Sequence, residues 1–324
     1  MNKHQNRIRH FAANNQIGMA LIISGLLFLS TIIANPRSLN AVAIGSILSL
    51  TSMLLIASAG QTLVIISDGI DMSVGATISM SALITVYVMQ GSDSIILMFA
   101  ALVLCVLAGG LVGLFNGVGA VKAGLPPMIV TLYISNIVTR LQYVFTGGQP
   151  EHTSVPVWYK ELITTRYFGV IPAIIFFALI IFAIVTFLLS RTRYGMQVTL
   201  LGNNNRAAFL SGVKTTKVKM LNYMVAGMLG GLAGFIGAGN SGFIKCSTYD
   251  AMTMDSIVAV VVGGTLLSGG KGSYLGTAAG ALLLIILSNG LAVLQVTDSI
   301  KNLIMGVVLI ILLTAYNRAK PVRQ

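Results

Sequence analysis

Long apolar runs separated by short polar stretches constrain this chain more than any other feature of its sequence. A helix needs about 20 apolar residues to cross a bilayer. The chain is 56% hydrophobic and only 9% charged, whereas soluble domains carry about 25% charged residues. We therefore predict an all-α polytopic membrane helical bundle, one transmembrane domain over residues 1–324. Its transmembrane helices should number about ten, over residues 17–34, 41–66, 75–88, 94–121, 125–145, 168–190, 220–239, 257–267, 274–293 and 303–315.

The basic stretch at residues 191–219 indicates which side of the membrane the loops face. It holds six lysines and arginines and no acidic residue. Basic loops close to span ends resist translocation and stay in the cytoplasm. An even number of spans then places both termini in the cytoplasm of a multi-pass inner-membrane protein. The stretch divides the chain into a first half, residues 17–190, and a second half, residues 220–317.

Within this stretch, residues 207–213 are predicted to form one or two helical turns, with residues 203–205 as candidate N-caps. A short helix facing the cytoplasm would let a membrane subunit bind a soluble partner protein that supplies energy. An ordinary solvated connector is the alternative. The candidate ATPase-coupling residues are Gly202, Asn203, Asn204, Ala207, Ala208, Ser211 and Gly212.

Two glycine-containing segments resemble each other and predict an internal repeat. Residues 60–63 (Gly-Gln-Thr-Leu) match residues 263–266 (Gly-Gly-Thr-Leu), and the turn at 67–75 aligns with the turn at 268–276. Both turns fall on the inner side of the predicted topology, and transporter halves related in this way place their path between them. Chance similarity in a glycine-rich chain is the alternative. The repeat-turn residues are Asp68, Gly69, Asp71, Ser73, Gly75, Ser268, Gly269, Gly270, Gly272 and Gly276.

Local features make three further predictions about packing. Gly60 and Gln61 predict that the second span is tilted or interrupted. Trp158 and Tyr159, in a long outer loop, predict a helix lying at the membrane surface. Small residues four positions apart let membrane helices approach closely, and the glycines with this spacing are Gly109, Gly113 and Gly117 in one span and Gly227/Gly231 and Gly230/Gly234 in another.

Several chemistries lack the residues that they need. A phosphate-binding loop requires a glycine six residues before its lysine and a Ser or Thr after it, but Lys271 has Thr265 and Gly272 at these places. Cys105 and Cys246 have no metal or redox spacing, and no set of reactive residues indicates an enzyme. The near absence of charge within the spans disfavours an ion-driven carrier. We expect no cofactor and no nucleic acid. Because the chain lacks nucleotide-binding motifs, any energy that it uses must come from another chain.

Four segments taken together carry a family signature. They are residues 66–75 (Ile-Ser-Asp-Gly-Ile-Asp-Met-Ser-Val-Gly), 191–195 (Arg-Thr-Arg-Tyr-Gly) followed by 202–213, 255–257 (Asp-Ser-Ile) and 263–273 (Gly-Gly-Thr-Leu-Leu-Ser-Gly-Gly-Lys-Gly-Ser). On these segments the chain resembles permease subunits of ATP-binding cassette (ABC) importers of the ribose/xylose/galactose type, from about residue 36 to residue 316. Asp68 departs from the pattern, because the family more often has glycine there, and residues 205–206 also vary.

This resemblance implies a permease that pairs with a second permease, identical or related, among membrane lipid. Each would dock through residues 202–213 on a cytoplasmic ATPase, and a periplasmic or lipid-anchored sugar-binding protein would deliver the solute. Its expected mechanism is alternating access to a weak central site. The candidates for lining the path are polar residues at membrane depth, namely Gln61, Thr62, Asn116, Thr131 and Asn136.

Two alternatives stay open at this point. Each polar residue at membrane depth could instead form an interhelical hydrogen bond, and the protein could be a self-contained channel or secondary carrier for a small polar solute. The solute itself could be a pentose such as ribose, a hexose, a polyol or a furanosyl signal molecule.

Overall fold

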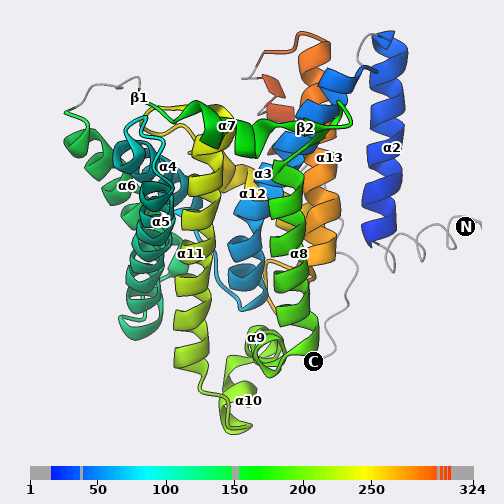
Figure 1. Cartoon of the computed structure of the whole chain (residues 1–324). Helices are drawn as coiled ribbons and strands as arrows, with labels where there is room; N and C mark the ends of the chain where they lie inside the picture. The colour runs from blue at the N-terminus through cyan, green and yellow to red at the C-terminus, as the bar shows by residue number, and fades with distance from the viewer. Residues whose placement is uncertain are drawn as a thin grey trace, which may run out of the picture.

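The computed structural model describes residues 16–36, 39–147, 153–297, 300–301, 303–304 and 306–307. The described chain is a helical bundle (Figure 1). Its helices are α2 (Gln16–Ala34), α3 (Ala41–Ile66), α4 (Val74–Met89), α5 (Ile95–Gly117) with the π-helical turn η2 (Val118–Lys122), α6 (Pro127–Phe145), α7 (Val157–Thr164), α8 (Ile174–Arg191), α9 (Arg193–Asn203), α10 (Asn205–Leu210), α11 (Thr215–Ser241), α12 (Met252–Val262) and α13 (Tyr274–Val293).

Seven of the described helices are long and apolar enough to cross a membrane, namely α2, α3, α5 with η2, α6, α8, α11 and α13. The predicted third and eighth spans are α4, with 16 residues, and α12, with 11 residues. Both are shorter than the roughly 20 residues that a span takes. The predicted tenth span, residues 303–315, lies mostly outside the described residues. The polytopic helical bundle is therefore confirmed, with two of its predicted spans reduced to short helices.

The helices α5 and α11 pack backbone to backbone through glycine. A Cβ on Gly109 would lie 2.1 Å from the carbonyl oxygen of Gly227, and a Cβ on Gly227 would lie 2.0 Å from that of Gly109. Gly113 lies equally close to Tyr223, and Gly231 to Cys105. These contacts run antiparallel along both helices, because a higher number on one pairs with a lower number on the other. The predicted role of these glycines in close packing is confirmed.

The helix α3 forms the centre of the bundle, and every residue of 52–66 is buried. It runs without a break for 26 residues, so of the two predicted alternatives the interruption at Gly60 and Gln61 is wrong and the tilt stays a prediction. Gly60 makes a close contact instead, since a Cβ on Gly60 would lie 2.5 Å from the Cα of Ala226. Gly60 thus allows α11 to pack closely against α3 while α3 stays helical.

The two repeat turns meet at one end of the bundle, which is the lower end in Figure 1, where α9 and α10 also lie. The first turn, residues 67–73, follows α3, and the second turn, residues 263–273, precedes α13. The amide of Gly270 donates a hydrogen bond to the carbonyl of Ile66 at 2.8 Å. The matching of residues 60–63 with residues 263–266 fails, however, because Gly60 lies inside α3 whereas Gly263 is the residue that ends α12.

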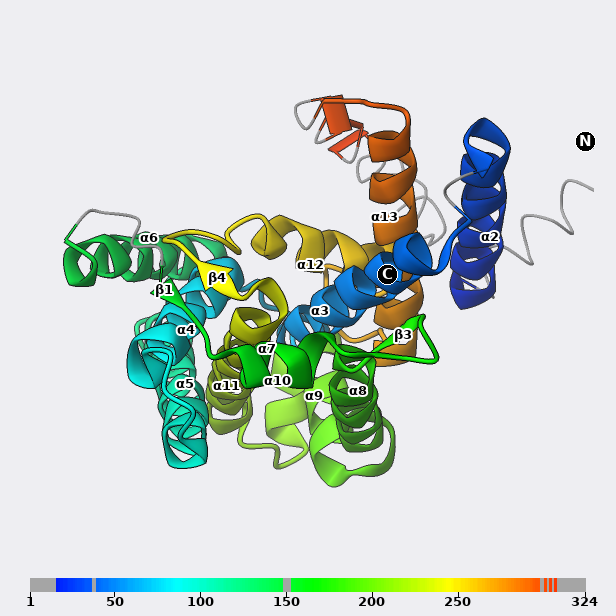
Figure 2. The ribbon, with the colours of Figure 1, turned by 45° about the horizontal axis from the view of Figure 1, so that its top comes forward.

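The opposite end, which faces the viewer in Figure 2, carries α7 and two short strand pairs. Strand β1 (Thr153–Ser154) pairs with β4 (Phe243–Ile244), and β2 (Arg166–Tyr167) pairs with β3 (Ile171–Pro172), both antiparallel. Tyr159 in α7 is fully buried, and its hydroxyl donates to the carbonyl of Phe235 at 2.6 Å. The predicted helix is present as α7, but Tyr159 points into the bundle, because its phenol finds a carbonyl acceptor there.

Candidate functional site

Three separate parts of the backbone meet at the end of α9. A Cβ on Gly202 would lie 1.9 Å from the carbonyl oxygen of Ile66, at the end of α3, and 2.4 Å from the amide nitrogen of Gly270. Since no side chain fits in this space, glycine is required at position 202 for the three backbones to touch. We call the contact of Gly202, Asn203, Ile66 and Gly270 the junction.

The side chain of Asn203 holds the second turn at the junction. Its Nδ2 donates to the carbonyl of Gly270 at 3.2 Å and to the carbonyl of Thr199 at 3.0 Å. Gly270 and its neighbour Gly269 both have a φ of +74°, a conformation that glycine adopts at no steric cost. The tight turn at these two glycines brings the second turn within reach of both α3 and α9.

The basic stretch is folded into two helices, which is more structure than the sequence predicted. The hydroxyl of Thr192 accepts from the amide of Gly195 and caps α9, and the Oδ1 of Asn204 accepts from the amide of Ala207 at 3.0 Å and caps α10. The capping prediction for residues 203–205 is therefore confirmed at Asn204. We call residues 193–213 the coupling segment.

One side of the coupling segment is buried and the other is exposed. Val198, Leu201, Ala208 and Val213 form a small apolar core with Ile66 and with Val218 of α11. On the outer side, Phe209 is 66% exposed and Leu210 is 78% exposed. The other exposed residues between positions 202 and 213 are Asn203, Asn204, Asn205, Arg206, Ala207, Ser211 and Gly212.

The structure assigns different positions to the predicted coupling residues. Gly202 and Ala208 are buried against the bundle, and Asn203 is exposed but bonds to the junction through its side chain. Asn204, Ala207, Ser211 and Gly212 face outward. The sequence analysis missed Phe209 and Leu210, although two bulky apolar residues inside an otherwise polar stretch are a signal that could have found them.

The first repeat turn is fixed by buried polar groups. Asp71 accepts hydrogen bonds from the amide of Ser73 at 2.8 Å and from its hydroxyl at 2.6 Å, and Asn116 donates to the Ser73 hydroxyl at 2.8 Å. Thr131 accepts from the amide of Met72 at 2.9 Å. Asp68 stands at a φ of +61° and forms a salt bridge with Lys219 at 3.7 Å. Asn116 and Thr131 thus tie α5 and α6 to this turn.

The second turn is held by its own glycines and by the cap of α13. The hydroxyl of Ser273 accepts from the amide of Gly276 at 3.0 Å. A Cβ on Gly276 would lie 2.1 Å from the carbonyl oxygen of Gly263, and one on Gly272 would meet Thr265. Ser268 is exposed. After the first turn, the corresponding glycine, Gly75 in α4, donates its amide to Thr253 of α12 at 2.9 Å, so α4 and α12 touch where they begin.

The candidate path residues do not gather in one place. Gln61 is fully buried, and neither atom of its amide has a hydrogen-bond partner among the described residues. Thr62 bonds to Thr277 of α13 at 2.9 Å. Asn116 and Thr131 belong to the first turn, as described above. Asn136 lies on the exposed face of α6 and donates to the carbonyl of Leu132 in its own helix at 3.0 Å.

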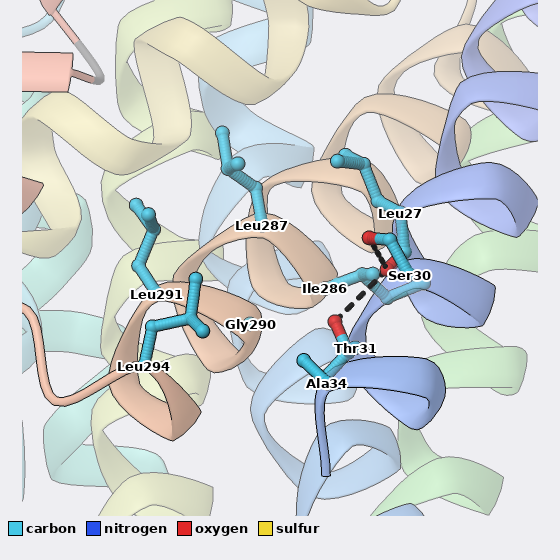
Figure 3. Close-up of a pocket in the computed structure, with 9 residues that line it drawn as sticks. All are labelled: Leu27, Ser30, Thr31, Ala34, Ile286, Leu287, Gly290, Leu291 and Leu294. Carbon is cyan, nitrogen blue, oxygen red and sulfur yellow. Dashed lines mark hydrogen bonds between the residues drawn. The ribbon is translucent and has the colours of Figure 1, made fainter.

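A pocket of about 100 Å³ lies between α2 and α13 (Figure 3). The hydroxyls of Ser30 and Thr31 both donate to the carbonyl of Leu27, at 2.7 and 2.9 Å, so they are already bonded within α2. The remaining lining residues are Ala34, Ile286, Leu287, Gly290, Leu291 and Leu294. This apolar pocket suits a hydrocarbon chain better than a hydrophilic solute.

Comparison with known proteins adds evidence that is independent of this geometry. A family described as "Branched-chain amino acid transport system / permease component" matches residues 43–313. The chain is 31% identical over 308 residues to the ribose import permease protein RbsC of Bacillus subtilis, covering 95% of this chain and 94% of that protein. It is 32% identical over 318 residues to the RbsC of Haemophilus influenzae, covering 96% and 98%.

Another similar protein carries a different name. The chain is 29% identical over 310 residues to the autoinducer 2 import system permease protein LsrC of Escherichia coli strain SMS-3-5, covering 96% of this chain and 89% of that protein. No solved structure matches the chain. The similar proteins are therefore import permeases that align over nearly their whole length.

Proposed function

Because this chain belongs to the permease family of branched-chain amino acid transport systems, we propose that it is the membrane-spanning subunit of an ABC importer for a monosaccharide. The permeases that align with nearly the whole chain are named for ribose and for autoinducer 2. Ribose-like pentoses or related sugars are accordingly the substrate class. As a transport subunit it has no ATPase activity of its own and depends on a separate ATPase subunit.

The coupling segment is the observation that carries this proposal. It offers Phe209 and Leu210 to a partner on its outer side while its inner side touches the ends of α3 and the second turn. The basic residues around it, which include exposed Arg206, Lys214 and Lys217, favour a cytoplasmic location. An apolar pocket with acidic groups at its rim, on the ATPase, is the complementary surface.

The junction gives this segment a direct mechanical connection to the bundle. When ATP binding draws two ATPase subunits together, each pushes its coupling segment as a rigid unit. Because Gly202 lies in van der Waals contact with both Ile66 and Gly270, the push moves α3 and the second turn together. A closely packed contact of this kind switches between discrete arrangements and does not deform continuously. Alternating access requires such a switch, between an outward-open and an inward-open state.

Further partners follow from the same assignment. A second permease, identical or related, completes the path, and a periplasmic or lipid-anchored binding protein delivers the sugar to the end of the bundle that carries α7. Both chain termini are then cytoplasmic.

Reconstitution tests the proposal against a self-contained carrier. The permease alone and the permease with its ATPase and binding protein are placed in liposomes, and entry of radiolabelled ribose and xylose is followed. We expect uptake only with all subunits and ATP. Sugar flux through the permease alone would refute the proposal. Separately, labelling of a Ser211→Cys variant by an impermeant reagent is expected only in opened cells, and labelling in intact cells would place the coupling segment outside.

A further inference from the structure

One face of α6 is polar and aromatic although it is exposed at the side of the bundle. Figures 1 and 2 both show α6 at the edge of the molecule. Tyr133 is 66% exposed and Tyr143 is 38% exposed, and Asn136 and Arg140 between them are also exposed. Their spacing of three, four and three residues puts all four on the same face of a helix. We call these four residues the α6 stripe.

The opposite face of α6 fixes this orientation. Thr131, Val138 and Gln142 are buried there. Thr131 accepts from the amide of Met72 at 2.9 Å, and the Nε2 of Gln142 donates to the carbonyl of Ala76 at 3.1 Å. Turning the stripe inward would break these buried hydrogen bonds, so the stripe faces away from the described bundle.

A comparison with α8 shows that the stripe is unusual for a surface in contact with lipid. In the most apolar 18-residue stretch of both α6 and α8, the same share of residues, 22%, is buried. Up to Phe187, the exposed residues of α8 are Phe176, Leu179, Ile180, Ala183, Ile184 and Phe187, all apolar, and its exposed polar residues, Ser190 and Arg191, lie at its last two positions. The helix α6 instead has the lowest mean hydropathy of the seven candidate spans. The stripe is therefore a polar band on a helix that also exposes Leu132, Ile137, Leu141 and Val144, and the middle of α8 has no such band.

The depth of the stripe decides against lipid contact. Asn136 stands at the middle of the 19-residue helix α6, and its amide donates to the carbonyl of Leu132 in the same helix at 3.0 Å. Asn side chains at this depth commonly bond to a neighbouring helix, and an ionisable residue such as Arg140 faces the protein interior or a water-filled cavity. Arg140 is closer to the outer end and could extend to the headgroups, but the amide of Asn136 is too short to do so. The stripe as a whole requires a polar neighbour.

We propose that the α6 stripe lines the water-filled route of the solute and binds a neutral, polyhydroxylated molecule such as a sugar. The phenol rings of Tyr133 and Tyr143 offer flat apolar surfaces for the faces of a sugar ring, and Asn136 and Arg140 offer hydrogen-bond donors for its hydroxyls. Tyr143, nearest the outer end of α6, meets the incoming solute first, and Arg140 lies one turn deeper. This inference rests on the proposed function and specifies its path.

Cysteine labelling in native membranes tests where the stripe faces. Asn136→Cys and Tyr133→Cys are compared with Leu107→Cys and Ile180→Cys, exposed positions in the apolar spans α5 and α8. The native cysteines, Cys105 and Cys246, are buried, and the unsubstituted protein gives the background. With a charged, membrane-impermeant thiosulfonate we expect labelling at positions 136 and 133 at least tenfold faster than at positions 107 and 180, and slower labelling when ribose is present.

Two results would overturn this inference. Labelling at position 136 as slow as at position 107 would show a lipid-facing stripe. Disulfide formation between two copies through Asn136→Cys, without labelling, would show that the stripe is a contact between permeases. Labelling does not require transport, so a failed uptake assay with the unsubstituted importer would contradict the proposed function while leaving this measurement readable.

Uptake kinetics supply a second test of the sugar contact. We expect Arg140→Leu to raise the KM for uptake at least fivefold while ATPase stimulation is kept, and Arg140→Lys to restore most of the affinity. A KM unchanged in Arg140→Leu and in Tyr133→Ala would contradict a role of the stripe in sugar binding.

Discussion

Gly202 of the coupling segment lies against the carbonyl oxygen of Ile66, and a Cβ at position 202 would be only 1.9 Å from that oxygen. We therefore expect Gly202→Ala to separate α9 from α3, with an overpacking cost of about 1–3 kcal/mol and a loss of most ATP-driven uptake. Immunoblotting of membranes and sugar uptake measure the two effects. Gly25→Ala in α2 is the matched control, because a Cβ there meets nothing within 4 Å. Normal uptake by Gly202→Ala would refute the junction as the connection.

Leu210 is 78% exposed on the coupling segment, so its replacement should affect a partner rather than the fold. We expect Leu210→Asp to reduce co-purification with the ATPase subunit and uptake at least tenfold, with a melting temperature within about 2 °C of the parent, since exposed substitutions change stability little. Ala208→Asp is the contrasting variant, because Ala208 is 3% exposed, and it should destabilise the segment itself. Equal ATPase binding by Leu210→Asp and the parent would count against the docking role.

Asp68 has a φ of +61° and pairs with Lys219, and the side chains of Lys219 and Asp68 are 19% and 58% exposed. The exposed salt bridge contributes about 0–1 kcal/mol, and glycine would relieve the backbone strain by a similar amount. We expect Asp68→Gly to leave the melting temperature nearly unchanged, whereas Asp68→Val lowers it, because a β-branched residue at this φ is strained. Thermal unfolding in detergent distinguishes the two, and a large loss with Asp68→Gly would mean that the ion pair dominates.

The contact of Gly109 with Gly227 predicts a difference between adjacent glycines of α5. A Cβ on Gly109 would collide with backbone, whereas one on Gly110 would meet only the Met228 side chain at 3.2 Å. We expect Gly109→Ala to lower the free energy of unfolding by about 1–3 kcal/mol and Gly110→Ala to leave it almost unchanged, because a methionine side chain adapts. Urea or thermal unfolding in detergent gives the comparison.

Gln61 is buried with no partner for its amide among the described residues. An unsatisfied buried amide costs about 1–3 kcal/mol, so Gln61→Met should raise or preserve the melting temperature. If the amide instead finds a partner in another transport state, the same variant should slow uptake. A fall in the melting temperature would show that Gln61 is already bonded in the resting protein.

The apolar runs and glycine spacings predicted much of this fold because membrane helices depend on local sequence. The bounds of α3 and α13 and the glycine contacts between α5 and α11 follow directly from hydrophobic length and small residues. The junction could not be predicted, since it depends on three distant backbones meeting at Gly202, Ile66 and Gly270. The predicted match of residues 60–63 with residues 263–266 also failed. The two segments have similar glycine-containing sequences, but the first forms a helix contact inside α3 and the second ends α12.

The coupling segment keeps its inward and outward surfaces on different residues. Gly202 and Asn203 contact the bundle at the junction, whereas Phe209 and Leu210 are largely exposed. Such a separation makes the outward surface exchangeable. Replacing residues 204–212, with Ala208 kept, by those of another permease should let this protein bind the ATPase of that permease while its own sugar selectivity stays unchanged.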